Sequence, residues 1–199
     1  METNLTCADC SALACKRVDD EGYPAFCPTR GFCLADDAEL QEELADEETW
    51  KVFEASAVSA YEAYDLKLSR IEEIILFARE MGARKIGIAS CTTMAREAHA
   101  AVRIFREAGF EVVGAMCKIG SLTNEDLSLT VPRRLDRKTV ICNPIHQARV
   151  LNEAGTDLNV VMGLCAGHDS LFFKHADALS TMLVVKDFKH DHCPVLALR

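Results

Sequence analysis

Short apolar runs alternate with stretches of helical length over the second half of the chain. The runs cover residues 85–90, 110–116, 139–142, 158–164 and 181–185, and their length and composition are typical of buried strands. Helical stretches separate most of them, at about 93–108, 144–155 and 170–175. Strands joined by helices pair in parallel, with helices on both faces of the sheet. The pattern predicts an α/β domain with a three-layer, Rossmann-like, mostly parallel sheet of about five strands.

Residues 119–137, between the second and third runs, show no helical stripe of apolar side chains. A connection of this length in a compact domain is often functional, for example as a lid over a site. A disordered connection would have the same pattern, and the sequence leaves both alternatives open.

Residues 34–82, which precede the predicted sheet, are predicted to form a helical segment. Its apolar and aromatic side chains recur at helical spacing and are expected to pack in the core: Trp50, Phe53, Ala57, Ala60, Tyr61 and Tyr64. A second helix begins at Ser69, which has the spacing of a capping box with Glu72, and this helix ends at Gly82. We expect the whole segment to lie against the α/β domain.

The first 33 residues are rich in cysteine, glycine and proline and contain few core-forming side chains. Such a segment needs a metal in order to fold. The expected ligands are Cys7, Cys10, Cys15 and Cys27. A Cys-x2-Cys turn with two further thiolates completes a tetrahedral zinc site, and the same set suits an iron–sulfur cluster; structural zinc is favoured. The chain is thus predicted to have three parts, at residues 1–33, 34–82 and 83–199.

Four cysteines each lie at or just beyond the end of a predicted strand: Cys91, Cys117, Cys142 and Cys165. The carboxyl ends of parallel strands meet at one edge of a sheet, where ligands bind. A single cysteine at a strand end is usually a small buried hydrophobic residue, but four at the same edge indicate an active or cofactor site. Two neighbours could move protons there, His168 and Asp169. The sequence predicts an iron–sulfur cluster or reactive thiols at this edge.

Weaker candidates lie near the end of the chain. His190, His192 and Cys193 have the composition of a ligand cluster, although short histidine-rich turns are more often surface structure. Lys174 and Lys186 could neutralise an anionic substrate or could simply be exposed.

Charge and composition narrow the class of function. The formal net charge is −9, and the acidic residues concentrate between Asp36 and Glu48, a pattern that indicates a solvated helix face. Basic residues are scattered and aromatic residues are few, which argues against nucleic-acid binding. No apolar run reaches the roughly 18 residues of a membrane helix, and no signal peptide is visible. We expect a cytoplasmic protein with reduced thiols and a small-molecule substrate.

Three motifs in the chain resemble those of a known family. They are the Cys7/Cys10/Cys15/Cys27-Pro28 opening, the run Cys142-Asn-Pro-Ile-His-Gln-Ala, and the run Gly163-Leu-Cys165-Ala-Gly-His168-Asp-Ser-Leu-Phe172 within a longer match from Leu158 to Asp187. Over essentially its full length the chain is similar to a family of uncharacterised prokaryotic proteins that are predicted to bind metal. The resemblance implies metal binding without an established reaction. It includes a cysteine after each of the first two strands, as at Cys91 and Cys117, but no cysteine at the positions of Cys33 and Cys193.

Three hypotheses follow for the function. The favoured one is a metal-binding protein with a thiolate-bound metal or iron–sulfur cluster at the sheet edge, and with redox or sulfur-transfer activity on a small molecule. The second is a non-enzymatic metal-binding, sensing or interaction module with structural zinc. The third is a small-molecule binder whose strand-end cysteines are ordinary core residues.

Overall fold

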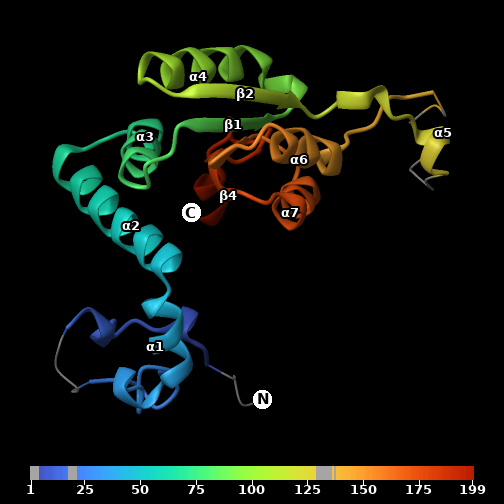
Figure 1. Ribbon diagram of the computed structural model, residues 1–199. Helices are drawn as coiled ribbons and strands as arrows, with labels where there is room; N and C mark the ends of the chain where they lie inside the picture. The colour runs from blue at the N-terminus through green and yellow to red at the C-terminus, as the bar shows by residue number, and fades with distance from the viewer. Residues whose placement is uncertain (1–4, 18–21, 129–135, 137) are drawn as a thin grey trace. The chain divides into compact units, whose positions relative to one another are not determined.

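The computed structural model describes residues 5–17, 22–128, 136 and 138–199 (Figure 1). The chain divides into two compact units, Met1–Val52 and Phe53–Arg199. The connection at 119–137, for which the sequence leaves a lid and a disordered loop as alternatives, falls partly on residues 129–135 and 137, which lie outside the described residues.

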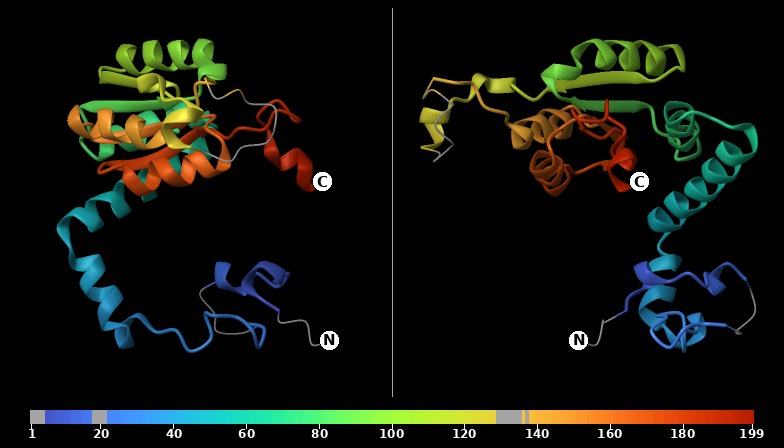
Figure 2. Two further views of the ribbon diagram at one scale, coloured as in Figure 1. Left: turned by 90° about the vertical axis from the view of Figure 1, so that its right-hand side faces the viewer. Right: turned by 180° about the vertical axis from the view of Figure 1, so that it is seen from behind.

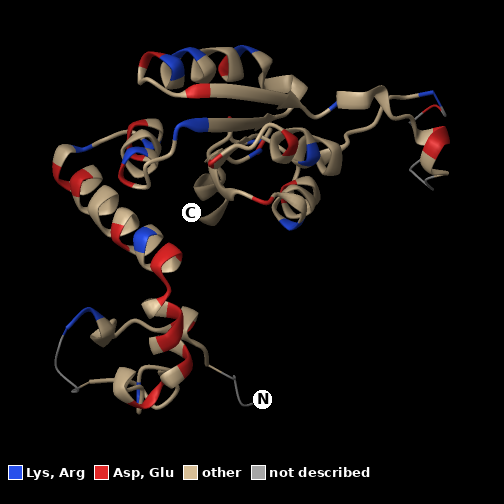
Figure 3. Ribbon diagram, viewed as in Figure 1, with Lys and Arg blue, Asp and Glu red and all other residues tan. Residues whose placement is uncertain are grey.

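The first unit consists of short helical turns and loops. Its elements are the 3-10 turns η1 (Cys7–Asp9), η2 (Ala14–Lys16) and η3 (Leu34–Asp36), helix α1 (Ala38–Ala45) and the start of α2 (Glu47–Leu66). Of the described residues in this unit only Ala14 is buried, so burial of apolar surface contributes little to its stability. Five of the eight acidic residues between Asp36 and Glu48 lie on α1 or in the first turn of α2 (Figure 3). Helix α1 is capped by Asp37, whose carboxylate accepts from the amide of Leu40 at 3.0 Å.

Helix α2 does not bury the aromatic stripe, so the prediction that these side chains pack in the core is wrong. Phe53, Tyr61 and Tyr64 are exposed, with 57%, 77% and 74% of their surface accessible, and Trp50 is exposed as well. The helix buries two small residues instead, Ala55 and Ser59. Helical spacing identifies a stripe of aromatic side chains, but it does not show which stripe of a helix faces the core. No described helix, α2 included, is both long enough and apolar enough to cross a membrane.

The second unit has a Rossmann-like α/β fold. Its strands are β1 (Lys85–Ser90), β2 (Glu111–Met116), β3 (Leu158–Met162) and β4 (Leu179–Val184). They form a sheet in the order β2-β1-β3-β4, and every pair is parallel. The alternation of apolar runs and helices therefore predicted the architecture correctly.

The described residues contain four strands in this sheet rather than five, because the predicted strand at 139–142 does not join it. Val140 makes a single antiparallel bridge with Thr123. The amide of Ile141 donates to the carbonyl of Leu122 at 2.8 Å, and the amide of Asn124 donates to the carbonyl of Thr139 at 3.1 Å. The run thus satisfies its backbone groups locally, against residues 122–124, in a connection that also contains the short helix α5 (Asn124–Leu127).

Helices cover both faces of the sheet. Helices α3 (Arg70–Glu80) and α4 (Ala95–Glu107) pack on one face, and α6 (Pro144–Glu153) and α7 (Ala166–His175) on the other. In the turned views of Figure 2 the green helix α4 and the orange helices α6 and α7 lie on opposite sides of the strands. Phe105 anchors the first face in a T-shaped contact with Phe110, and the fully buried Phe172 anchors the second. The capping box of α3 is present as predicted, with both reciprocal hydrogen bonds between Ser69 and Glu72.

The connection from β3 to α7 is tighter than predicted. Strand β3 ends at Met162, and α7 begins at Ala166, four residues earlier than expected, with Cys165 as its N-cap. Gly163 makes this turn possible: its φ is +62°, and a Cβ atom there would lie 2.6 Å from the sulfur of Met94. Gly167 differs from Gly163 in both respects. It lies in α7 without a positive φ, and a Cβ atom there would have open space around it.

Candidate functional site

Two of the four predicted cysteines are cross-strand neighbours at the carboxyl edge of the sheet. Cys91 directly follows β1, and Cys117 directly follows β2. The amide of Cys117 donates to the carbonyl of Ser90 at 2.9 Å, which continues the parallel ladder beyond the last paired residues. Their sulfur atoms lie 3.9 Å apart, and both side chains are buried, with 5% and 1% of their surface accessible.

Cys142 also lies at this edge of the sheet, although no described strand directly precedes it. The amide of Asn143 donates to the carbonyl of Cys117 at 2.8 Å and so fixes the chain just before α6. The Asn143 side chain caps α6 by accepting from the amide of His146 at 3.0 Å, as the Asn-Pro pair predicts. The Cys142 sulfur then lies 3.6 Å from that of Cys117.

Gln147 holds α6 against the ends of β1 and β2. It is fully buried, and its side-chain amide donates to the carbonyls of Ser90 at 3.1 Å and Ala115 at 2.7 Å. These carbonyls lie next to the positions from which the thiols of Cys91 and Cys117 project. Gln147 therefore fixes the distance between the helix that follows Cys142 and the two strands that precede the other thiols.

Lys186 connects the fourth cysteine to this group. It lies two residues beyond β4, and its ammonium nitrogen is 3.0 Å from the sulfur of Cys91 and 3.5 Å from that of Cys165. The hydroxyl of Thr93 donates to Cys91 at 3.1 Å. The structure thus brings all four sheet-edge cysteines into one chain of contacts, in which the Lys186 ammonium links the buried Cys91 to the exposed Cys165. We call these four residues and Lys186 the thiol cluster.

The cluster gives its thiols different acidities. Burial alone would raise the pKa of Cys91, but hydrogen bonds from Lys186 and Thr93 outweigh it and lower this pKa to about 7. Burial, together with the neighbouring Cys117 thiol, raises the pKa of Cys142 to about 11. Near neutral pH the cluster therefore holds a thiolate that can attack at Cys91 and a protonated thiol at Cys142.

His168 and Asp169 lie in the first turn of α7, beside the cluster. Burial lowers the pKa of His168, and the charges of Lys186 and Lys118 lower it further, so the imidazole is neutral at pH 7. Burial raises the pKa of Asp169 to about 6, and one of its carboxyl oxygens has no hydrogen-bond partner in the described residues. Neither side chain bonds a sulfur atom in the part of the chain that the structure describes, so their predicted role in proton transfer stays a prediction.

The histidine-rich turn after β4 has internal hydrogen bonds that fix the chain directly after Lys186. Asp187 accepts from the His190 ring at 2.8 Å, and its amide donates to His192 at 3.2 Å. The Phe188 ring lies 5.1 Å from the ammonium nitrogen of Lys186. Within the described residues the side chains of these histidines are therefore hydrogen-bonded to Asp187 of the same turn. Cys193 is exposed.

The N-terminal cysteines are not brought together in the same way. Cys7 and Cys15 are exposed, while Cys10 and Cys27 are half-buried. Among the described residues no group of three or more His, Cys, Asp or Glu side chains is placed to hold a metal ion, at these positions or at the sheet edge.

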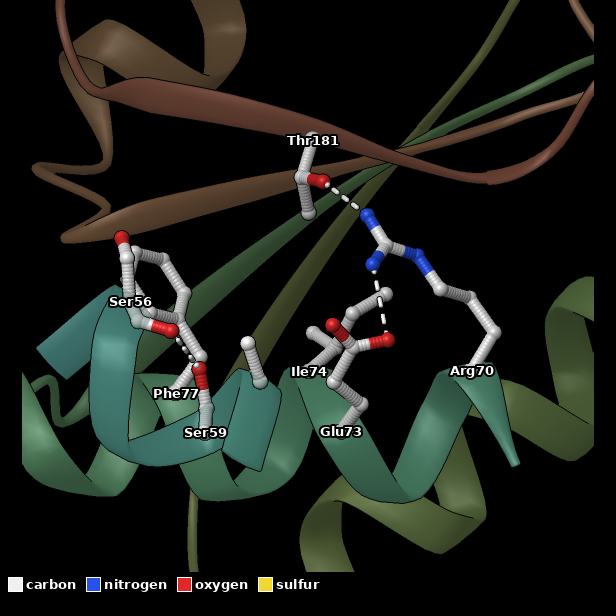
Figure 4. Close-up of a pocket in the computed structure, with 8 residues that line it drawn as sticks. Ser56, Ser59, Arg70, Glu73, Ile74, Phe77 and Thr181 are labelled. Atoms are coloured by element: carbon white, nitrogen blue, oxygen red, sulfur yellow. Dashed lines mark hydrogen bonds and ion pairs between the residues drawn. The ribbon is translucent and has the colours of Figure 1, made fainter. Parts of the chain in front are cut away.

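A separate cavity of about 310 Å³ lies between α2, α3 and β4 (Figure 4). Arg70 donates to the hydroxyl of Thr181 at 2.8 Å and pairs with Glu73 at 2.9 Å. The hydroxyl of Ser59 donates to the carbonyl of Ser56 at 3.2 Å. The polar groups that line this cavity already bond one another. We therefore interpret them as structural contacts that hold α3 against β4.

Sequence reasoning left the role of Lys186 open and gave none to Thr93, Lys118 or Gln147. Lys186 could have been found, because it follows a strand of the sheet just as the cysteines do. The rule that ligand-binding groups gather at the carboxyl ends of parallel strands applies to charged residues as well as to thiols. Nothing in the local sequence distinguishes Gln147 from an exposed helical glutamine.

Two comparisons with known proteins bear on this site. A family described as "Protein of unknown function (DUF1847)" matches residues 27–183, a range that contains the whole cluster except Lys186. The chain is also 40% identical over 163 residues to "Uncharacterized protein MJ0455" of Methanocaldococcus jannaschii, which covers 81% of this chain and 83% of that protein. Neither description names a reaction, a ligand or a partner.

Proposed function

Since the chain belongs to the DUF1847 family of proteins of unknown function, we propose a function from the geometry of the thiol cluster alone. We propose that the protein is a thiol-dependent redox protein that reduces a small disulfide, with Cys91 as the attacking thiolate and Cys117 as the resolving thiol. The observation that carries this proposal is the position of Cys91, with the Lys186 ammonium 3.0 Å from its sulfur and the Cys117 sulfur 3.9 Å away.

The reaction has two steps. The Cys91 thiolate attacks one sulfur of the small disulfide, forms a mixed disulfide and releases the other half as a thiolate. Cys117 then attacks the Cys91 sulfur as a thiolate, which releases the second half of the substrate and leaves a Cys91–Cys117 disulfide; the proton that Cys117 gives up is taken up by a released thiolate of the substrate. Two electrons pass from the protein to the substrate, and an external dithiol must return them for a further cycle.

The backbone geometry supports the second step. Neighbouring strands lie about 4.8 Å apart, and disulfides join Cα atoms about 4.4–6.8 Å apart. Cys91 and Cys117 extend the β1–β2 ladder, so their backbones lie at a separation that a disulfide bridges. The burial of Cys91 favours a small substrate over a protein disulfide, because only 5% of its surface is accessible.

Oxidation of the full chain tests this proposal. Treatment of the reduced protein with bis(2-hydroxyethyl) disulfide, followed by peptide mapping, is expected to give a Cys91–Cys117 disulfide as the first intramolecular product. The Cys117→Ser variant is expected to stop at the mixed disulfide on Cys91, whereas Cys193→Ser, which changes an exposed cysteine outside the cluster, should behave like the wild type. First oxidation at another pair, or an unreactive Cys91, would contradict the proposal.

A second candidate function is a thiolate-bound metal or iron–sulfur cluster at the same edge. The sulfur spacings of 3.6 and 3.9 Å favour thiolates bound to one tetrahedral metal ion, since metal–sulfur bonds of about 2.3 Å place such sulfur atoms about 3.8 Å apart. The residues that would hold the group are Cys91, Cys117, Cys142 and Cys165. Lys186 would have to move, because its ammonium lies between Cys91 and Cys165. An iron–sulfur cluster would supply one-electron redox chemistry, and zinc would make the site structural.

Zinc or an iron–sulfur cluster at Cys7, Cys10, Cys15 and Cys27 is a separate part of this second candidate. It is supported by the first unit itself, whose described residues include only one buried side chain, because a segment without a core needs another source of stability.

Iron, sulfide and zinc analysis of the anaerobically purified full chain distinguishes metal at the sheet edge from metal in the first unit. Loss of metal in Cys117→Ser points to the sheet edge, and loss in a Cys7→Ser/Cys10→Ser variant points to the first unit. Metal-free wild-type protein after reconstitution would contradict both.

A further inference from the structure

A cavity of about 720 Å³ opens beside the thiol cluster. Cys142 forms part of its wall, and the Cys142 sulfur lies 3.6 Å from that of Cys117. His168, at the start of α7, lines the cavity as well. The volume lies within the range of small-molecule sites, about 300–1,000 Å³. A molecule in this cavity would therefore contact Cys142, the thiol that lies next to Cys117 in the cluster.

Most of the wall is apolar. The apolar side chains come from the connection after β2, from the start of α6 and from α7, and they are Leu122, Leu127, Val140, Ile141, Pro144, Ile145 and Leu171. Leu127 and Leu171 are themselves exposed, with 50% and 38% of their surface accessible. A ligand that covered them would remove apolar surface from water on both sides, which is favourable.

The charged side chains that the described residues contribute to the wall are basic. They are Lys118 and Arg149, and none of the described aspartates or glutamates lines the cavity, although the chain as a whole has a net charge of −9. Within the described part of the chain, Lys118 donates one hydrogen bond, to the carbonyl of Val140; an ammonium group has three donors, so two are open to a ligand. Arg149 is exposed on α6. A cavity with this lining attracts an anion and disfavours a cation.

We infer that this cavity binds a small amphipathic anion, in which an apolar chain or ring carries a carboxylate or a similar acidic group. The apolar body would cover Leu127 and Leu171, and the acidic group would pair with Arg149 and Lys118. This inference rests on the proposed function in one respect: when the bound molecule also carries a disulfide, it is the substrate that the thiol cluster reduces. The inference adds a substrate class, because the cluster by itself would accept any small disulfide.

A matched set of eight-carbon ligands tests the inference with the full chain. Octanoate, octanol and octylammonium have the same apolar chain, and only octanoate carries a negative charge. In a titration followed by NMR, octanoate is expected to bind at least about tenfold more tightly than octanol, and octylammonium more weakly than either. The shifted resonances should be those of the cavity residues. Equal affinities for octanoate and octanol, or shifts elsewhere, would overturn the inference.

Variants of the two cations complete the test. Arg149→Met is expected to weaken octanoate binding about fivefold to tenfold and to leave octanol binding unchanged, and Lys118→Met should act in the same direction. Arg106→Met is the matched control, because Arg106 is exposed in the last turn of α4, outside the cavity lining. If Arg149→Met and Arg106→Met lower the affinity equally, the inference is wrong.

The failure of this inference can be told apart from the failure of the proposed function. Octanoate should bind the Cys91→Ser variant as tightly as it binds the wild type, since Cys91 does not line the cavity. Octanoate binding together with an unreactive Cys91 would reject the redox function and keep the site. A reactive Cys91 without octanoate binding would reject the anion site and keep the redox function.

Discussion

Replacing Lys186 with methionine is expected to raise the pKa of Cys91 from about 7 to its ordinary value near 9 or above. The ammonium of Lys186 lies 3.0 Å from the Cys91 sulfur and favours the charged thiolate, whereas burial favours the neutral thiol. Methionine keeps the length and apolar stem of lysine and removes the charge. Without that charge the remaining donor, Thr93, has to oppose burial by itself.

The pH profile of Cys91 alkylation measures this change. In the wild type the rate should rise with pH and level off above pH 7, because about half of the thiol is ionised at its pKa. In Lys186→Met the rise should move up by about two pH units. At pH 7 the rate should fall only about fivefold to tenfold, because a thiolate of higher pKa is the better nucleophile and partly compensates for its lower population.

Lys189→Met provides the control for this experiment. Lys189 is an exposed lysine three residues further along the chain, and within the described residues the ammonium that bonds Cys91 and Cys165 is that of Lys186. Its removal should leave the Cys91 profile unchanged. An unshifted profile in Lys186→Met would show that the lysine does not control the thiol, and it would remove the main support for Cys91 as the attacking group.

Replacing Phe172 with alanine is expected to lower the free energy of unfolding by about 3–5 kcal/mol, the range for deleting a buried phenylalanine ring. Phe172 is fully buried and belongs to the core on the α6–α7 face of the sheet, together with Cys91 and Cys117. The lost ring would leave a cavity under the helix that carries His168 and Asp169. Urea denaturation of the two proteins under the same reducing conditions gives the difference.

The next residue supplies a matched control for this substitution. Phe173 has the same side chain and lies in the same helix, but 39% of its surface is accessible. Phe173→Ala should therefore cost much less, about 1 kcal/mol. Equal losses for the two variants would show that α7 does not pack through Phe172 as described.

Much of the fold was predictable because it depends on local patterns. The apolar runs at 85–90 and 158–164 led to β1 and β3, and the Asn143-Pro144 pair led to the start of α6. The run at 139–142 is also apolar and rich in β-branched residues, yet it makes only a bridge to Thr123. Composition indicates that a segment is extended and apolar, and the partner of its backbone groups depends on the rest of the chain. The aromatic stripe of α2 is a similar case, because helical spacing does not show which side of a helix the rest of the chain covers.

The candidate site was predictable only in part. Cys91, Cys117 and Cys165 follow strands, so the parallel topology by itself places them at one edge. Cys142 is at this edge although its predicted strand is absent, because Asn143 is bonded to the backbone of Cys117. The cation among the thiols comes from Lys186, 95 residues away from Cys91 in the sequence, and only the folded chain shows that contact.

The sequence by itself determined the α/β class, the parallel pairing and the edge at which the cysteines gather, since these follow from periodicity and from the connections that parallel strands require. The tertiary structure decided which thiols touch, which of them is ionised near neutral pH, and that an apolar cavity with basic residues lies beside Cys142. The physical reason is range. Backbone conformation responds to neighbours along the chain, whereas the acidity of a thiol depends on burial and on charges within a few ångströms, and packing alone brings those groups together.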